Sequence, residues 1–132
     1  MSMIPERLLD LLSDEKKAFA SLALTLADGS PQVTPIWFGW DGTHLILNTA
    51  RGRVKDRVMK RGGKVALLIV DPADPYRYVQ IRGRVAGETE DGAYDTICDL
   101  QLKYRGNRDY PKRPGEVRVT YKVLPETVTP RA

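Results

Sequence analysis

Short strand-like segments, each ended by turn residues, fill most of this 132-residue chain and constrain its fold more than any other feature. Apolar, β-branched or aromatic residues dominate them, often in the alternation expected of strands with one buried face. The segments are residues 18–27, 32–40, 44–49, 64–70, 76–88 and 116–124. Short turns at residues 28–31 and 41–43 make consecutive strands antiparallel neighbours. Gly83 and Gly87 allow the fifth strand to bend, so the six strands suit a small closed or split barrel.

Helical patterns occupy three intervals between the strands. Pro5 suits the first position of a helix over residues 5–12, whose leucines supply an apolar face. Residues 51–61 and 91–104 predict two further helices, and Gly62 and Gly63 end the first of these. The pattern therefore predicts a mainly β fold of the α+β class with two or three flanking helices. The length is that of one domain, so residues 1–132 are expected to fold as a single unit.

Residue types that bind metals or act as nucleophiles are scarce. Cys98 is the sole cysteine and His44 the sole histidine. An intrachain disulfide is therefore excluded, and neither a zinc site nor a Ser/His/Asp or Cys/His catalytic system is expected. The longest apolar run, residues 65–70, is far too short to span a membrane, and the first residues lack a signal-peptide pattern. We expect a cytoplasmic protein without metal and without a membrane partner.

Positive charge is concentrated in two segments. The chain has a formal net charge of +4, yet residues 51–64 carry +6 and residues 103–122 carry +5, while residues 1–50 and 71–102 are acidic. Such a concentration indicates an anionic partner. A nucleic-acid-binding barrel would interleave aromatic side chains with the basic ones, and residues 51–64 contain no aromatic residue. We therefore expect a partner other than nucleic acid.

The first basic segment coincides with a predicted strand–turn–helix unit over residues 47–57. Cations at the start of a helix face the positive end of its dipole, which is unfavourable. Four cations are nevertheless placed there: Arg51, Arg53, Lys55 and Arg57. A bound phosphate would make the same cations favourable, so the unit predicts a phosphate site. The alternative is a solvated basic helix face without a ligand.

Two strands carry further candidate binding residues. Pro35 interrupts a strand at a position that can make no ladder bond, which leaves backbone free to meet the edge of a planar ligand. Trp37 and Phe38 point to opposite faces of that strand, so one of them can line a pocket. Tyr78 lies on a polar-aromatic face of the strand over residues 76–88. The structural alternative for Trp37 and Phe38 is that they are plain core aromatics. The structural alternative for Tyr78 is that it lies on a half-exposed sheet face.

In this order, the segments resemble the pyridoxamine 5'-phosphate oxidase-like split-barrel proteins, which bind flavins or deazaflavins. The resemblance is carried by residues 26–38, by Asn48-Thr49 with Arg53-Val54-Lys55, by the loop at Asp71 with Tyr78 and residues 81–83, and by residues 103–104 with 114–119. The resemblance covers nearly the whole chain. It is stronger to the branch of coenzyme F420-dependent reductases than to the family as a whole. It implies a six-stranded antiparallel split β-barrel.

The resemblance also implies a homodimer with two cofactor clefts at the interface, each lined by both chains. Asn48, Thr49, Arg53 and Lys55 would hold the cofactor phosphate, and the segment from Pro35 to Trp37 would meet the ring. Tyr78 matches the position from which the partner chain closes the site. The full implied set is Pro35, Ile36, Trp37, Asn48, Thr49, Arg53, Val54, Lys55, Arg57 and Tyr78.

The activity implied is hydride transfer from reduced coenzyme F420 to an unsaturated small-molecule acceptor, in which the protein orients the cofactor. An FMN-binding oxidoreductase and a non-catalytic flavin- or deazaflavin-binding protein are the alternatives. Coenzyme F420 continues beyond its phosphate into several glutamates, whereas FMN ends at the phosphate. The further cations Arg51, Arg57, Lys60 and Arg61 therefore favour F420. Residues 103–122 could meet the acidic tail across the interface.

Overall fold

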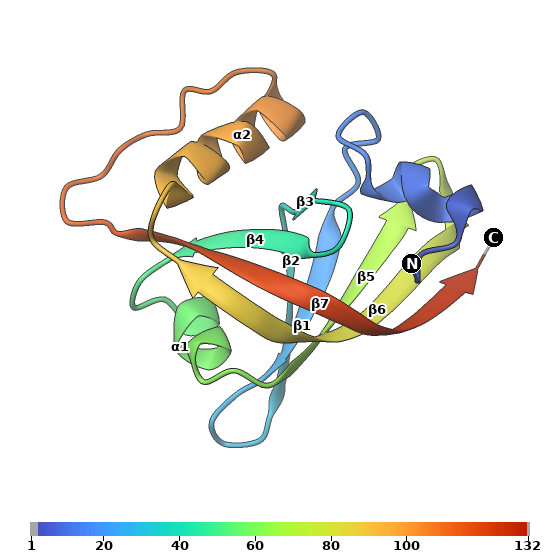
Figure 1. The fold of residues 1–132 in the computed structure, drawn as a ribbon, viewed down its shortest axis with the longest axis horizontal. Helices are drawn as coiled ribbons and strands as arrows, with labels where there is room; N and C mark the ends of the chain where they lie inside the picture. The colour runs from blue at the N-terminus through green and yellow to red at the C-terminus, as the bar shows by residue number, and fades with distance from the viewer. Residues whose placement is uncertain (1–2, 132) are drawn as a thin grey trace.

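A single antiparallel sheet of seven strands forms most of the molecule in a computed structural model that describes residues 3–131. Its strands are β1 (Ala20–Thr25), β2 (Pro31–Ile36), β3 (Gly39–Trp40), β4 (Leu45–Ala50), β5 (Lys64–Asp71), β6 (Asp74–Thr89) and β7 (Arg118–Arg131), in the order β2-β1-β5-β6-β7-β4-β3 (Figure 1). The helices are the 3-10 helix η1 (Glu6–Leu12), α1 (Val54–Lys60) and α2 (Ala93–Arg105). The mainly β class with three flanking helices is confirmed.

The sheet curls because its two edge strands are consecutive in the chain. Only Trp37 and Phe38 separate β2 from β3, which are the opposite edges of the sheet. The three peptide steps from Ile36 to Gly39 span at most about 11 Å. The two edges must therefore lie near each other, and the sheet forms a partly open barrel, consistent with the predicted split barrel.

The prediction of six strands is wrong because residues 32–40 form two strands rather than one. Phe38 turns its side chain into the core, where it is fully buried. Its backbone binds side chains of α2 instead of a neighbouring strand: the Phe38 N–H donates to Tyr104 Oη at 3.3 Å, and Lys103 Nζ donates to the Phe38 carbonyl at 2.7 Å. These bonds replace ladder bonds, so the strand ends at Ile36 and a new one starts at Gly39.

The predicted bends in the long strand are confirmed. The register of β6 against β7 shifts between Arg82 and Gly83 and again between Val85 and Gly87. β6 pairs with β5 from Asp74 to Arg84 and with β7 from Tyr78 to Thr89. Bulges of this kind increase the local twist and let one strand turn around a small core.

The core is the apolar interior of the curled sheet, covered at one end by η1. Leu8 and Leu11 of η1 are fully buried and belong to the same cluster as Leu47 and Ile81 from the sheet. Arg77 ties η1 to the sheet, because its guanidinium contacts carboxylates of both. Met59 of α1 is 1% exposed and belongs to the same cluster. The buried residues of α2 are not part of this cluster, and Figure 1 shows α2 over β4 and joined to β7 by a long loop.

A buried lysine anchors α2 over the break between β2 and β3. The Lys103 side chain is 1% exposed, and its Nζ lies 4.0 Å from the centroid of the Phe38 ring. Its Nζ lies 3.9 Å from a carboxylate oxygen of Asp14. Burial lowers the pKa of Lys103 to about 8, against the smaller opposing effects of Asp14 and Glu15.

This burial makes stability depend on pH in a defined window. The folded pKa of Lys103 lies below its unfolded value, so the unfolded chain binds more protons between about pH 8 and 10, and stability rises with pH there. From pH 8 to 9.5 we expect the unfolding free energy to rise by about 1–2 kcal/mol relative to that of Lys103→Met. Urea denaturation of both proteins measures the difference. If the unfolding free energies of the two proteins differ by the same amount at pH 8 and at pH 9.5, the lowered pKa of Lys103 is contradicted.

Candidate functional site

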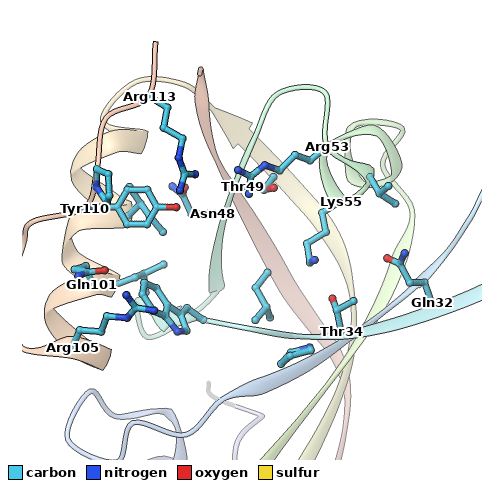
Figure 2. A pocket seen from close by; sticks show the side chains of 17 residues that line it. Gln32, Thr34, Asn48, Thr49, Arg53, Lys55, Gln101, Arg105, Tyr110 and Arg113 are labelled. Carbon is cyan, nitrogen blue, oxygen red and sulfur yellow. The ribbon is translucent and has the colours of Figure 1, made fainter. Parts of the chain in front are cut away.

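A cavity of about 620 Å³ lies between α2 with its following loop and the strands β2 and β4. Figure 2 shows Arg53 and Lys55 on one side of it and Arg105 and Tyr110 on the other. Four basic side chains and no acidic one belong to its lining residues. Eight of the ten predicted cofactor-binding residues line it: Pro35, Ile36, Trp37, Asn48, Thr49, Arg53, Val54 and Lys55.

The other two predicted residues lie outside this cavity. Arg57 is exposed on α1, and its Nη1 donates to the carbonyl of Gly52 at 2.8 Å. Tyr78 lies on β6 opposite Val70 and Arg131, and it is partly exposed. The resemblance implies that Tyr78 closes the site of a partner chain. This role stays a prediction.

Lys55 and Arg53 bring two positive charges together at the cavity. Lys55 is partly buried, and this burial, with the nearby charge of Arg53, lowers the pKa of Lys55. No carboxylate within residues 3–131 pairs with its ammonium group. Arg53 is half exposed and has one acidic contact, from Nη2 to Glu116 Oε2 at 3.1 Å. Partly buried like charges are unfavourable unless an anion joins them, so the pair is suited to bind one.

Asn48 has a structural role that the sequence did not indicate. Its Nδ2 donates to the Ala93 carbonyl at 2.9 Å and to Thr120 Oγ1 at 3.1 Å, while its Oδ1 accepts from Arg118 Nε at 2.9 Å. Both amide hydrogens are thus used to hold β4 against α2 and β7. The hydroxyl of Thr49, by contrast, has no hydrogen-bond partner in the described chain. Thr49 can therefore offer a donor to a ligand that Asn48 cannot.

The second basic segment lines the same cavity within the same chain. Arg105 ends α2, and Tyr110 and Arg113 follow in the loop that leads to β7. The loop is held by Tyr94, whose Oη donates to the Tyr110 carbonyl at 2.6 Å, and by Arg118, whose guanidinium lies 5.2 Å from the Tyr110 ring. Two segments about fifty residues apart in sequence thus give one cavity its positive charge.

Nine residues that line the cavity lie outside the predicted binding set: Gln32, Thr34, Ile97, Leu100, Gln101, Arg105, Tyr110, Pro111 and Arg113. The last four belong to the basic segment 103–122, which was expected to meet an acidic tail across the interface and here lines the cavity of its own chain. Gln32 and Thr34 could have been found, because strand alternation puts them on the same face as Ile36. The α2 residues carry no such signal, since their contact with the cavity depends on how the helix docks on the sheet.

The family model of pyridoxamine 5'-phosphate oxidase matches residues 4–129. The chain belongs to this pyridoxamine 5'-phosphate oxidase family. The resemblance read from the sequence is therefore confirmed.

Solved structures of related chains agree with this family. An F420 reductase is 33% identical with a TM-score of 0.81, and the match covers 96% of this chain and 98% of the reductase. A conserved hypothetical protein from Mycobacterium tuberculosis is 18% identical, with coverage of 98% and 85% and a TM-score of 0.74. An FAD and heme binding protein from Mycobacterium smegmatis is 20% identical, with coverage of 98% and 71% and a TM-score of 0.66. The last two share the fold. No curated protein sequence matches the chain.

In this member of the pyridoxamine 5'-phosphate oxidase family, Arg51 is bound to protein carboxylates rather than available to a ligand. Its guanidinium contacts Glu88 at 2.5 Å, Glu90 at 2.8 Å and Asp56 at 3.0 Å. These hydrogen bonds, led by the one to Glu88, raise the pKa of Arg51. The residue therefore ties the turn before α1 to the end of β6, and it adds no free charge for an acidic tail.

The helix after this turn is shorter than predicted. α1 has seven residues, from Val54 to Lys60, and Arg53 is its N-cap. Lys60 and Arg61 are exposed near its end and do not belong to the residues that line the cavity. An anion site at this position in the family fold therefore depends on the side chains of Arg53 and Lys55 and not on the helix dipole.

Residues 3–131 contain no cluster of three or more His, Cys, Asp or Glu side chains that could bind a metal ion. Its helices are all too short or too polar to cross a membrane.

Proposed function

We propose that the cavity binds coenzyme F420 and that the protein transfers hydride between this cofactor and an unsaturated small-molecule acceptor. The observation that carries the proposal is the partly buried Lys55 beside Arg53, in a cavity whose lining has four cations and no acid. The 33% identity to an F420 reductase over nearly the full length of both chains supports the choice of cofactor.

The residues present fit such a cofactor. Arg53 and Lys55 would contact its phosphate, with the Thr49 hydroxyl as an additional donor. Trp37 lines the same cavity, and the edge of its ring would contact the deazaflavin ring. β2 is an edge strand, so its outward backbone groups at Pro35 and Ile36 are free of a second strand and can meet the polar edge of the ring.

The cofactor supplies the redox chemistry when it is bound. The reduced cofactor would supply a hydride to one carbon of the acceptor double bond, and solvent would supply a proton to the other. The protein contributes binding, orientation and exclusion of water. Arg113 adds positive charge at the loop side of the cavity, where it would stabilise a cofactor with several carboxylates.

An FMN-dependent oxidoreductase is the second candidate, and one observation favours it. Arg51 is bound to three carboxylates, so the cations of this turn that line the cavity are Arg53 and Lys55. That pair matches the single phosphate of FMN.

A homodimer is part of the proposal, with Tyr78 of one protomer closing the cavity of the other. Tyr76, two residues away on the same face of β6, is 74% exposed, as expected of a side chain that meets a partner. Sedimentation at micromolar concentration tests this arrangement. A monomer would contradict the shared cleft.

Titration with coenzyme F420, FMN and riboflavin tests the cofactor assignment. We expect F420 to bind at least tenfold more tightly than FMN, and riboflavin, which lacks the phosphate, to bind at least a hundredfold more weakly than F420. Fluorescence of the cofactors measures all three affinities. Tighter binding of FMN would replace F420 by FMN in the proposal. Riboflavin binding equal to FMN binding would contradict the phosphate site.

A further inference from the structure

Arg105 is a cation in the cavity that the proposed phosphate site does not use. It is the last residue of α2, and Figure 2 shows it on the opposite side of the cavity from Lys55. Within residues 3–131 no carboxylate pairs with its guanidinium. A positive charge is favourable at the end of a helix, so an arginine fits this position without cost to α2.

The guanidinium of Arg105 is held at the end of an aromatic stack. Its Cζ lies 5.4 Å from the centroid of the Trp37 ring. Trp37 stacks on Tyr104 at 5.2 Å with an angle of 16°, and Tyr104 stacks on Phe19 at 5.0 Å with an angle of 18°. Tyr104 is itself fixed, because its Oη donates to the Ala18 carbonyl at 2.7 Å.

This stacking determines what Arg105 can bind. A guanidinium that lies over an aromatic ring keeps the N–H groups at its edge free. Those groups form a planar fork that matches the two oxygens of a carboxylate. Because the stack orders the side chain beforehand, less conformational entropy is lost when a ligand binds.

Arg105 is exposed, and it shares its cavity with three aliphatic side chains and one amide. Ile36, Ile97 and Leu100 line the same cavity, together with the side chain of Gln101. A ligand bound here would therefore place an anionic group on Arg105 and a small apolar body against these aliphatic side chains. The phosphate of a cofactor is already accounted for by Arg53 and Lys55 across the cavity.

We propose that Arg105 is the specificity-determining residue for the acceptor and binds its carboxylate, so that the substrate class is small unsaturated carboxylic acids. This inference rests on the proposed function for the identity of the second ligand as an acceptor. The carboxylate subsite itself rests on the position of Arg105 over Trp37 and on its lack of an acidic partner.

Cinnamate and cinnamamide test the subsite, because they share a shape and differ in charge. Calorimetric titration is done on the protein alone and on the protein with saturating coenzyme F420. Wild type is expected to bind cinnamate at least tenfold more tightly than cinnamamide. Arg105→Gln should abolish this preference and Arg105→Lys should retain part of it. Arg108→Gln, an exposed arginine on the following loop that pairs with Asp99, is the matched control and should keep the preference.

Each result supports or overturns the assignment. Equal binding of the two probes to wild type, or a preference that persists in Arg105→Gln, overturns it. Loss of the preference in Lys55→Gln would show that the carboxylate occupies the phosphate site instead. A tenfold loss of F420 affinity in Arg105→Gln would assign Arg105 to the cofactor. If F420 fails to bind while the cinnamate preference holds, the proposed function fails and the carboxylate subsite stands.

Discussion

Replacing Arg53 and Lys55 together with alanine is expected to weaken binding of the phosphate-bearing cofactor by at least a hundredfold. A hydrogen bond to a charged group contributes about 1.5–3 kcal/mol, so losing two costs about 3–6 kcal/mol of binding free energy. Lys55 has no acidic partner in the described chain, and Arg53 has one contact, with Glu116. Removing them therefore leaves the folded protein nearly as stable as before, while cofactor titration by fluorescence reports the loss.

The matched control is the double variant Lys60→Ala with Arg61→Ala. It removes the same net charge from the same helix region, but neither residue lines the cavity. The control should change affinity by about twofold, through long-range electrostatics that salt screens. Equal losses in the two double variants would mean that general charge attracts the cofactor. A large drop in the unfolding midpoint of the Arg53→Ala, Lys55→Ala variant would show that these two residues have a structural role instead.

Gly83→Ala is expected to have the largest effect on stability, a loss of about 3 kcal/mol, at the upper end of the usual cost of overpacking. A Cβ at this position would overlap the carbonyl oxygen of Leu124 and lie 3.2 Å from the Cα of Pro125. These are backbone atoms of β7, so they can move only if β6 and β7 separate at the bend. Urea denaturation monitored by circular dichroism measures the loss.

Gly87→Ala provides the comparison, because it lies at the other bend of the same strand. A Cβ there would meet no atom within 4 Å. Alanine has a lower conformational entropy cost than glycine in a strand, so this variant should be neutral or more stable by up to about 1 kcal/mol. A similar loss in both variants would show that the bends themselves, rather than the contact with Leu124, require glycine.

Much of the fold was predictable because it depends on local signals. Turn residues, alternation and the bend glycines correctly indicated an antiparallel, curved sheet, and Gly83 and Gly87 lie at the observed register shifts. The break at Phe38 was not predictable, since residues 32–40 have good strand propensity. It arises because Lys103 and Tyr104, more than sixty residues away, take the hydrogen bonds of the Phe38 backbone.

The candidate site also has a part that was predictable from local sequence signals and a part that was not. The segments from Pro35 to Trp37 and from Asn48 to Lys55 each gave a sequence signal, and they line one cavity. Composition could not distinguish a cation bound to protein from one available to a ligand. Arg51 and Lys55 look alike in the sequence, yet among the described residues Arg51 contacts three carboxylates and Lys55 contacts none.

The sequence by itself determined the family, the strand-rich class and the presence of two basic segments, because these follow from residue types and their spacing. The tertiary structure alone decided that both segments face one cavity, since this requires α2 and its loop to dock across the split between β2 and β3. It also decided which cations remain unpaired, because ion pairing depends on distances between residues far apart in the chain. The docking of α2 on the backbone between β2 and β3 is the physical cause of the first result. The approach of the end of β6 to the turn before α1 is the physical cause of the second.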